Sequence, residues 1–150
     1  MKKRFLILFA LLTVFLLTAV TACDSTSSDE PSTDYIYFEN TTGVRVLGFY
    51  ISDPESDAWG DKLNWGDYVG VGAKIHIDAA KLFNGAGVYD VGVYDENGML
   101  YEAYEVELTP GDSISMTADG EDAICVVTHM DGSQSEWYGY AYYADEEPED

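Results

Sequence analysis

The clearest structural signal in this chain is residues 88–108, VYDVGVYDENGMLYEAYEVEL, in which two runs rich in Val, Tyr and Leu flank the tetrapeptide DENG at 95–98. β-Branched and aromatic residues are typical of strands, and an Asn-Gly step accepts the positive φ of a tight turn. The segment therefore predicts an antiparallel hairpin. Alternation along 100–108 predicts one apolar face, interrupted by Glu102, and an opposite face that becomes polar toward its end. The apolar face is expected to contain Leu100, Tyr104, Val106 and Leu108, and the opposite face Tyr101, Ala103, Glu105 and Glu107.

Outward from this hairpin, the same pattern of short apolar runs separated by Gly, Asn, Asp and Pro continues in both directions. The expected strands are 35–39, 44–51, 73–77, 88–95, 99–108, 113–117, 123–130 and 136–143, with one short helical turn over 78–83. About eight strands joined by tight turns predict an all-β fold, as a single antiparallel β-sandwich. An immunoglobulin-like topology is one arrangement of such a sandwich, and a small open barrel is the alternative.

The composition limits which classes of function are open to the chain. Its 150 residues suit one domain, and 28 Asp and Glu against 7 Lys and Arg give a formal net charge of −21. This balance excludes a nucleic-acid partner, because binding a phosphate backbone requires clustered cations. Two cysteines exclude a disulfide framework and a structural zinc site, and we predict no cofactor.

The first residues have the layout of an export signal. Met1-Lys2-Lys3-Arg4 precedes an uncharged apolar run over 5–22, which ends in VTAC at 20–23. This ending resembles the lipobox of bacterial lipoproteins. The resemblance implies cleavage before Cys23 and attachment of a diacylglycerol to its sulfur, and a stable anchor then needs two or more acyl chains. The expected location is the exported side of a membrane in the bacterial cell envelope. The alternative interpretation of residues 1–23 is an ordinary signal anchor that ends in a cysteine by chance.

The chain accordingly divides into four parts. Residues 1–22 form the lipoprotein signal peptide, 23–34 a lipidated flexible tether, 35–144 the β-sandwich domain and 145–150 an acidic tail. The tether has no aliphatic or aromatic residue after Cys23, so nothing in it offsets the entropy of ordering. Eleven such residues reach an r.m.s. distance of about 18 Å.

Catalytic motifs are not found. His76 and His129, the only histidines, both fall within expected strands, and no nucleophile-elbow pattern occurs, so we interpret them as ordinary strand residues. Cys125 lies in an apolar strand and is expected to be a buried, inert thiol. Pairs of carboxylates are too common in this chain to identify a hydrolase site from the sequence.

The acidic loop 52–68, SDPESDAWGDKLNWGDY, departs from the strand pattern. Asp53, Glu55, Asp57 and Asp61 have an alternating spacing similar to that of calcium-binding loops. The glycine that an EF-hand needs at its sixth position is Ala58 here, so an EF-hand is rejected. An irregular calcium site and a solvated acidic loop remain as alternatives.

Two groups of aromatic residues are candidates for ligand binding. The acidic loop contains Trp59 and Trp65, which are expected either to plug one end of the sandwich or to form a ligand platform. Alternation over 136–143 sends Tyr138, Tyr140 and Tyr142 to one face and Trp137 and Tyr143 to the other. One face must be core, and the other is then an exposed aromatic ladder of the kind that marks binding surfaces.

Part of the domain is similar to a group of small bacterial secreted β-sandwich proteins. The similarity lies in NTTG at 40–43, YIS at 50–52, Trp59-Gly60 and Leu63, and it implies no activity. We therefore predict a non-enzymatic, lipid-anchored envelope protein with a binding or structural role, whose partners are the membrane and a protein or glycan ligand. An envelope hydrolase that uses carboxylates and a calcium-dependent adhesion module are the alternatives.

Overall fold

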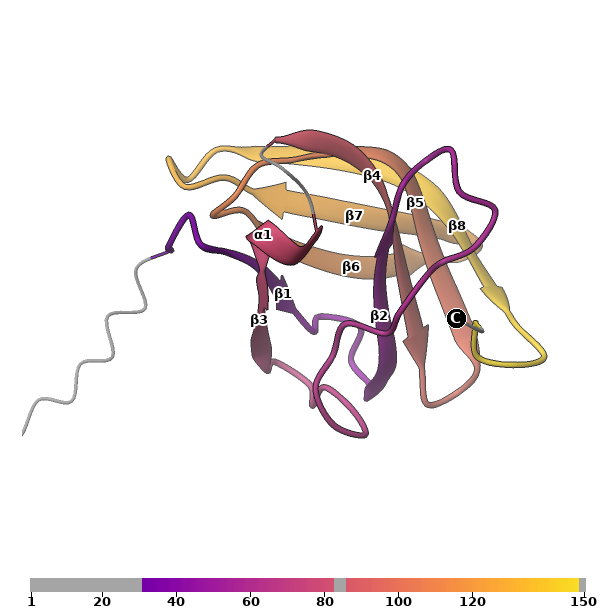
Figure 1. Cartoon of the computed structure of the whole chain (residues 1–150). Coiled ribbons are helices and arrows are strands. Elements are labelled where there is room, and N and C mark those ends of the chain that lie inside the picture. The colour runs from indigo at the N-terminus through magenta and orange to yellow at the C-terminus, as the bar shows by residue number, and fades with distance from the viewer. Residues whose placement is uncertain (1–30, 83–85, 149–150) are drawn as a thin grey trace, which may run out of the picture.

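A computed structural model of the chain describes residues 31–82 and 86–148. The expected signal peptide, Cys23 and most of the tether lie outside the described residues. Eight strands occur in the described part, and the all-β prediction is confirmed (Figure 1). They are β1 (Tyr35–Glu39), β2 (Val46–Ser52), β3 (Lys74–Asp78), β4 (Gly87–Asp95), β5 (Met99–Leu108), β6 (Ser113–Asp119), β7 (Asp122–Thr128) and β8 (Gln134–Tyr143), and α1 (Ala79–Leu82) is a single helical turn.

All eight strands belong to one sheet, in the order β2-β4-β5-β8-β7-β6-β1-β3. The strand pairs in this sheet are antiparallel except β1 with β6, which run parallel. The expected two-sheet sandwich and its immunoglobulin-like form are therefore not confirmed. The parallel pair joins strands that are far apart in the chain, and from β1 the chain crosses to β2 at the opposite edge of the sheet.

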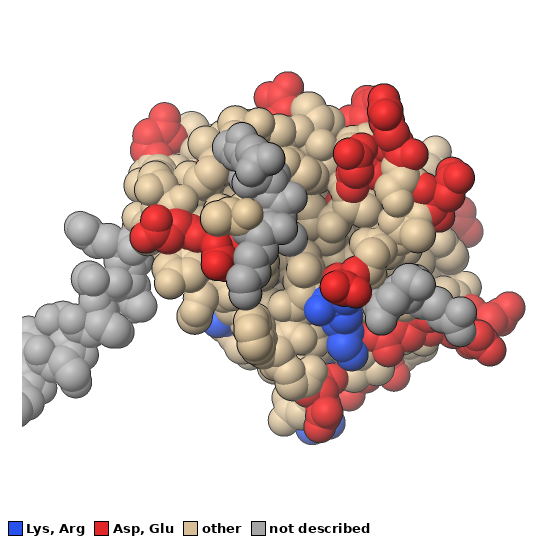
Figure 2. All heavy atoms as spheres, viewed as in Figure 1, with Lys and Arg blue, Asp and Glu red and all other residues tan. Residues whose placement is uncertain are grey.

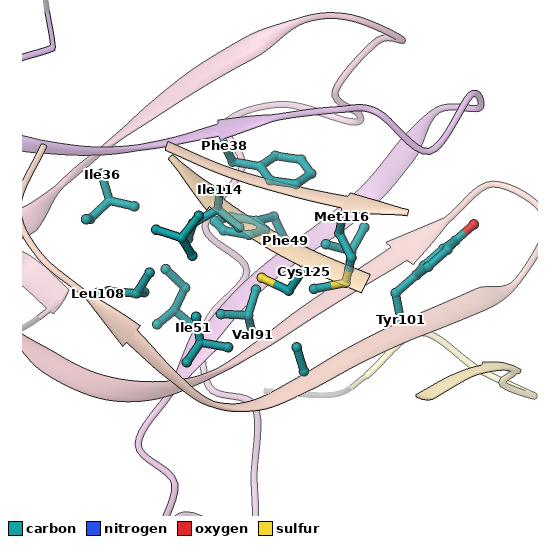
Figure 3. Packing of buried hydrophobic residues seen from close by; sticks show 14 of the residues in the cluster. Ile36, Phe38, Phe49, Ile51, Val91, Tyr101, Leu108, Ile114, Met116 and Cys125 are labelled. Atoms are coloured by element: carbon teal, nitrogen blue, oxygen red, sulfur yellow. The ribbon is translucent and has the colours of Figure 1, made fainter. Parts of the chain in front are cut away.

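The sheet curls so that its two ends face each other across the core. Phe38 of β1 and Phe49 of β2 stack with ring centroids 4.3 Å apart, although five strands separate β1 from β2 in the sheet order. Figure 3 shows these two rings beside Ile114, Met116 and Cys125. Burial of this single apolar cluster is the main force that holds the curl.

The free edge of β2 is covered by the acidic loop. The Asn64 side chain accepts a hydrogen bond from the Phe49 N–H (2.9 Å) and donates one to the Leu47 carbonyl (3.0 Å), while the Leu63 N–H donates to the Phe49 carbonyl (2.8 Å). An amide side chain thus satisfies backbone groups at the edge of β2 that would otherwise attract a further strand. The same contacts fix the base of the loop against the sheet.

Strand β5 contains a bulge that corrects the predicted face assignment. Glu105 has a φ of +55°, and Tyr89 pairs with Val106 whereas Val91 pairs with Ala103, so β5 holds one extra residue here. The core face therefore consists of Tyr101 and Ala103 before the bulge and of Val106 and Leu108 after it. The predicted continuous apolar face was wrong, because a bulge moves every following side chain to the other face. Tyr104 is 41% exposed, whereas Leu100 is buried as expected but lies outside the core cluster.

Candidate functional site

Strand β8 presents a row of tyrosines on the outer face of the sheet. Tyr138, Tyr140 and Tyr142 are 67%, 63% and 43% exposed, and Tyr104 of β5, 41% exposed, lies with its ring centroid 6.4 Å from that of Tyr140. On the opposite face Trp137 packs against the core as expected, whereas Tyr143, predicted for that same face, is 74% exposed at the end of β8. We call Tyr104, Tyr138, Tyr140 and Tyr142 the tyrosine strip.

Carboxylates hold three of the four hydroxyl groups of the tyrosine strip. The hydroxyls of Tyr104 (2.6 Å) and Tyr142 (3.0 Å) both donate to Glu102, which is only 7% exposed, and Tyr138 donates to the exposed Glu136 (3.0 Å). Burial and the adjacent Glu102 raise the pKa of Tyr142 to about 12, and the same two causes raise the pKa of Tyr104. The strip is therefore made of neutral rings with negative charge at their edges.

The acidic loop places its two tryptophans at different positions. Trp59 is half-buried and lies over Gly92 of β4, where a Cβ would stand 3.0 Å from the indole. It lines a hollow of about 220 Å³ together with Asp57, Asp90 and Glu102. Trp65 is 79% exposed and borders a separate hollow beside Ile77. The two indoles therefore form neither a shared plug nor a paired platform, because the loop between them turns back to bind the edge of β2.

The four acids considered for calcium are all exposed. Asp53 accepts a hydrogen bond from the Glu55 N–H (2.9 Å), which shapes the start of the loop. Within 31–82 and 86–148, no three His, Cys, Asp or Glu side chains are grouped closely enough to hold a metal ion. Calcium binding by Asp53, Glu55, Asp57 and Asp61 stays a prediction for experiment.

A further polar cluster was missed by the sequence analysis. His129 directly follows β7, its Nδ1 lies 3.0 Å from Oδ1 of Asp112, and its Nε2 lies 3.2 Å from Oγ of Ser135. Asp112, in the turn between β5 and β6, is 2% exposed, whereas His129 and Ser135 are half-buried. Only the strand register could have revealed this cluster. Ser113 pairs with Thr128 and Val127 with Ser135, which brings the three residues to one end of neighbouring strands.

Three further residues lie apart from these clusters, and one of them, Glu147, makes contacts that the sequence did not predict. Cys125 is fully buried, and burial raises the pKa of its thiol to about 12, as expected for an inert cysteine. His76 of β3 is exposed and packs edge-on against Tyr35, with ring centroids 4.8 Å apart. Glu147, in the segment expected to be a solvated tail, accepts a hydrogen bond from the buried Tyr50 hydroxyl (2.9 Å) and pairs with Lys62 (3.4 Å).

The surface is dominated by acidic groups, which Figure 2 shows distributed over the visible face with few cations between them. Among the residues that the structure describes, no helix combines the length and the apolar character required to cross a membrane. No family model matches this chain, and it has no match among the curated proteins or the solved structures.

Proposed function

We propose that this protein is a lipid-anchored binding module of the bacterial cell envelope, and that the tyrosine strip receives a basic segment of a partner protein. The observation that carries the proposal is the row of four exposed tyrosines on one sheet face. Exposed aromatic groups of this kind mark interaction surfaces, because tyrosine contributes a large contact area at a small cost in side-chain entropy.

Charge selects a cationic partner for this surface. The chain has a net charge of −21, and Glu102 and Glu136 lie directly at the hydroxyl edges of the rings. Lys and Arg side chains bind both to aromatic faces and to carboxylates, and a surface with both features attracts them in the encounter and in the complex. An acidic or neutral partner would be held only by stacking on the tyrosine rings, without attraction to the carboxylates.

The anchor part of the proposal rests on the sequence. The cationic, apolar and VTAC segments that end at Cys23 support lipidation at that residue, and 24–34 supplies a tether between the anchor and β1. A free chain of this composition and length has an r.m.s. end-to-end distance of about 18 Å, and Ser32 at its end donates its N–H to the Tyr37 hydroxyl. The tyrosine strip is then free to meet proteins at the exported side of the membrane.

A carboxylate hydrolase is the less supported alternative. The hollow beside Trp59 does bring Asp57, Asp90 and Glu102 to one place. Both oxygens of Glu102, however, accept tyrosine hydroxyls, and Oδ1 of Asp90 accepts the Glu105 N–H (2.9 Å). Glu102 and Asp90 thus hold the tyrosine strip and the bulge, so we favour binding.

The test measures binding of a synthetic peptide of alternating Arg and Gly to the chain from Asp24 onward, at a salt concentration of about 0.15 M, where the Debye length is about 8 Å. We expect the double variant Tyr138→Ser/Tyr140→Ser to bind at least tenfold more weakly than the parent. Tyr68→Ser removes another exposed tyrosine, 51% exposed, and should leave affinity unchanged.

Equal binding by the parent, the double variant and the Tyr68→Ser control would mean that net charge alone attracts the peptide, and would refute a role for the tyrosine strip. Binding to soluble glycans instead of the peptide would refute the cationic partner. A matched peptide in which Glu replaces Arg should not bind.

A further inference from the structure

The cluster of Asp112, His129 and Ser135 has the connectivity of a nucleophilic triad, and we propose that Ser135 is an acyl-accepting nucleophile that hydrolyses carboxylic esters. The His129 imidazole lies between the other two side chains, 3.0 Å from the Asp112 carboxylate and 3.2 Å from the Ser135 hydroxyl. A base within hydrogen-bond reach of the nucleophile, itself oriented by a third group, is the arrangement that activates serine.

The three side chains become more exposed from the carboxylate to the imidazole and the hydroxyl, as a nucleophilic triad requires. Asp112 is buried, the His129 side chain is 29% exposed, and Ser135 is half-buried. The carboxylate is thus shielded from water, while His129 and Ser135 keep part of their surface in contact with solvent. The cluster lies at the end of the curled sheet where the β5–β6 turn and the β7–β8 hairpin meet (Figure 1).

The partners of Asp112 determine which nitrogen of His129 carries the proton. Oδ2 of Asp112 accepts the Thr109 N–H (2.7 Å), and its backbone carbonyl accepts the Tyr37 N–H (2.9 Å), so the carboxylate is held in place from two sides. An ionised carboxylate can only accept, so Nδ1 of His129 must donate to Oδ1. In the neutral imidazole the lone pair of Nε2 is then directed at Ser135, and the Ser135 hydroxyl donates to it.

The proposed reaction follows from this proton arrangement. Ser135 Oγ bonds to the ester carbonyl carbon while its proton passes to Nε2 of His129. The carbon–oxygen bond to the alcohol then breaks, and the departing oxygen takes that proton, which leaves an acyl group on Ser135. Water repeats the sequence with the acyl group, restoring the serine and releasing a carboxylic acid.

Near Ser135, one edge of strand β8 has backbone groups that do not pair with a neighbouring strand. It pairs with β7 along Gln134–Tyr140, but with β5 only from Tyr140 onward. The edge of β8 beside Ser135 therefore has no strand partner among the described strands. Backbone N–H groups on such an edge are suitable donors for the oxyanion that forms when an ester carbonyl is attacked.

The experiment treats the full-length chain, extracted in detergent, with a fluorescent fluorophosphonate. In this probe the serine oxygen displaces fluoride from phosphorus, so the label stays covalently on an activated serine. We expect labelling of the parent at Ser135, identified by mass spectrometry of the labelled peptide, and none in Ser135→Ala. Ser133→Ala is the matched control, because Ser133 lies two residues away and its hydroxyl donates to Asp131 (2.6 Å).

A second measurement distinguishes activation of Ser135 by Asp112 and His129 from a purely structural role of these residues. Asp112→Asn conserves volume but removes the negative charge and replaces one of the two acceptor oxygens, which serve His129 and the Thr109 N–H, by an NH2 donor. We therefore expect kcat for p-nitrophenyl acetate to fall at least tenfold, with KM and the circular dichroism spectrum unchanged from the parent. Absence of label on Ser135 in a folded parent would overturn the proposal. Equal ester hydrolysis by the parent and Ser135→Ala would do the same.

Discussion

Replacing Gly139 with alanine is expected to destabilise the fold more than the same substitution at any other glycine within 31–82 and 86–148. Gly139 lies on the core-facing side of β8, where β5 approaches it closely as the sheet curls. A Cβ at this position would stand 1.8 Å from the Glu102 carbonyl oxygen and 3.0 Å from the Ala103 Cα. Its φ is not positive, so the need for glycine here is steric and does not arise from backbone conformation.

The size of the effect follows from what must move. The Glu102 carbonyl oxygen has to retreat from 1.8 Å to at least 3.0 Å, a displacement of 1.2 Å or more in a main chain that pairs with β8 at the next position. Overpacking of a core typically costs 1–3 kcal/mol, and a backbone clash belongs at or above the upper end, about 3 kcal/mol. For a domain of this size, that loss lowers the melting temperature by about 10 °C.

The assay is thermal and urea unfolding of the chain from Asp24 onward, followed by circular dichroism at equal salt. Gly70→Ala is the matched control, since a Cβ there meets no heavy atom within 4 Å and the φ of Gly70 is not positive. The control should stay within about 0.5 kcal/mol of the parent. A Gly139→Ala protein that melts within about 2 °C of the parent would refute the close passage of β5 over β8.

Two further predictions concern the anchor and the tyrosine strip. Cys23→Ser should abolish incorporation of a fatty-acid probe in living cells, because the serine oxygen is a poor nucleophile toward the lipid donor; a labelled variant would refute lipidation at that residue. Tyr142 has a pKa raised to about 12 in the folded state from an ordinary value of 10, so its contribution to stability is complete below pH 10 and is lost as the pH rises toward 12. Tyr142→Phe should therefore show a shallower fall in unfolding free energy between pH 10 and 12 than the parent, and an unchanged slope would contradict the shift.

Local patterns were sufficient to locate the strands and the direction of most side chains. All eight expected strands occur in the structure, with β1 and β5 at the predicted bounds. Tyr138, Tyr140 and Tyr142 share one exposed face as the alternation predicts, because a period of two depends only on neighbouring residues. Turn chemistry is equally local, and the Gly98 turn between β4 and β5 has the positive φ that its sequence predicts.

Features that depend on contacts between distant segments were decided by the tertiary structure. The parallel pairing of β1 with β6 and the curl that stacks Phe38 on Phe49 depend on how the whole apolar surface is buried, and no short window of sequence contains that information. The predicted faces were reversed in the first half of β5 by the bulge at Glu105, whose N–H donates to Asp90 on the neighbouring strand.

The candidate sites divide in the same way. The tyrosine strip of β8 could be predicted, since one strand supplies most of it. The convergence of Asp112, His129 and Ser135 could not, because it requires the register of β6 on β7 and of β7 on β8 at once. Strand alternation is a property of each segment alone, whereas register and curl minimise the free energy of the complete chain. The sequence by itself therefore determined where the strands lie and how the aromatic side chains of β8 alternate. Only the tertiary structure decided which face of β5 belongs to the core and which distant side chains meet.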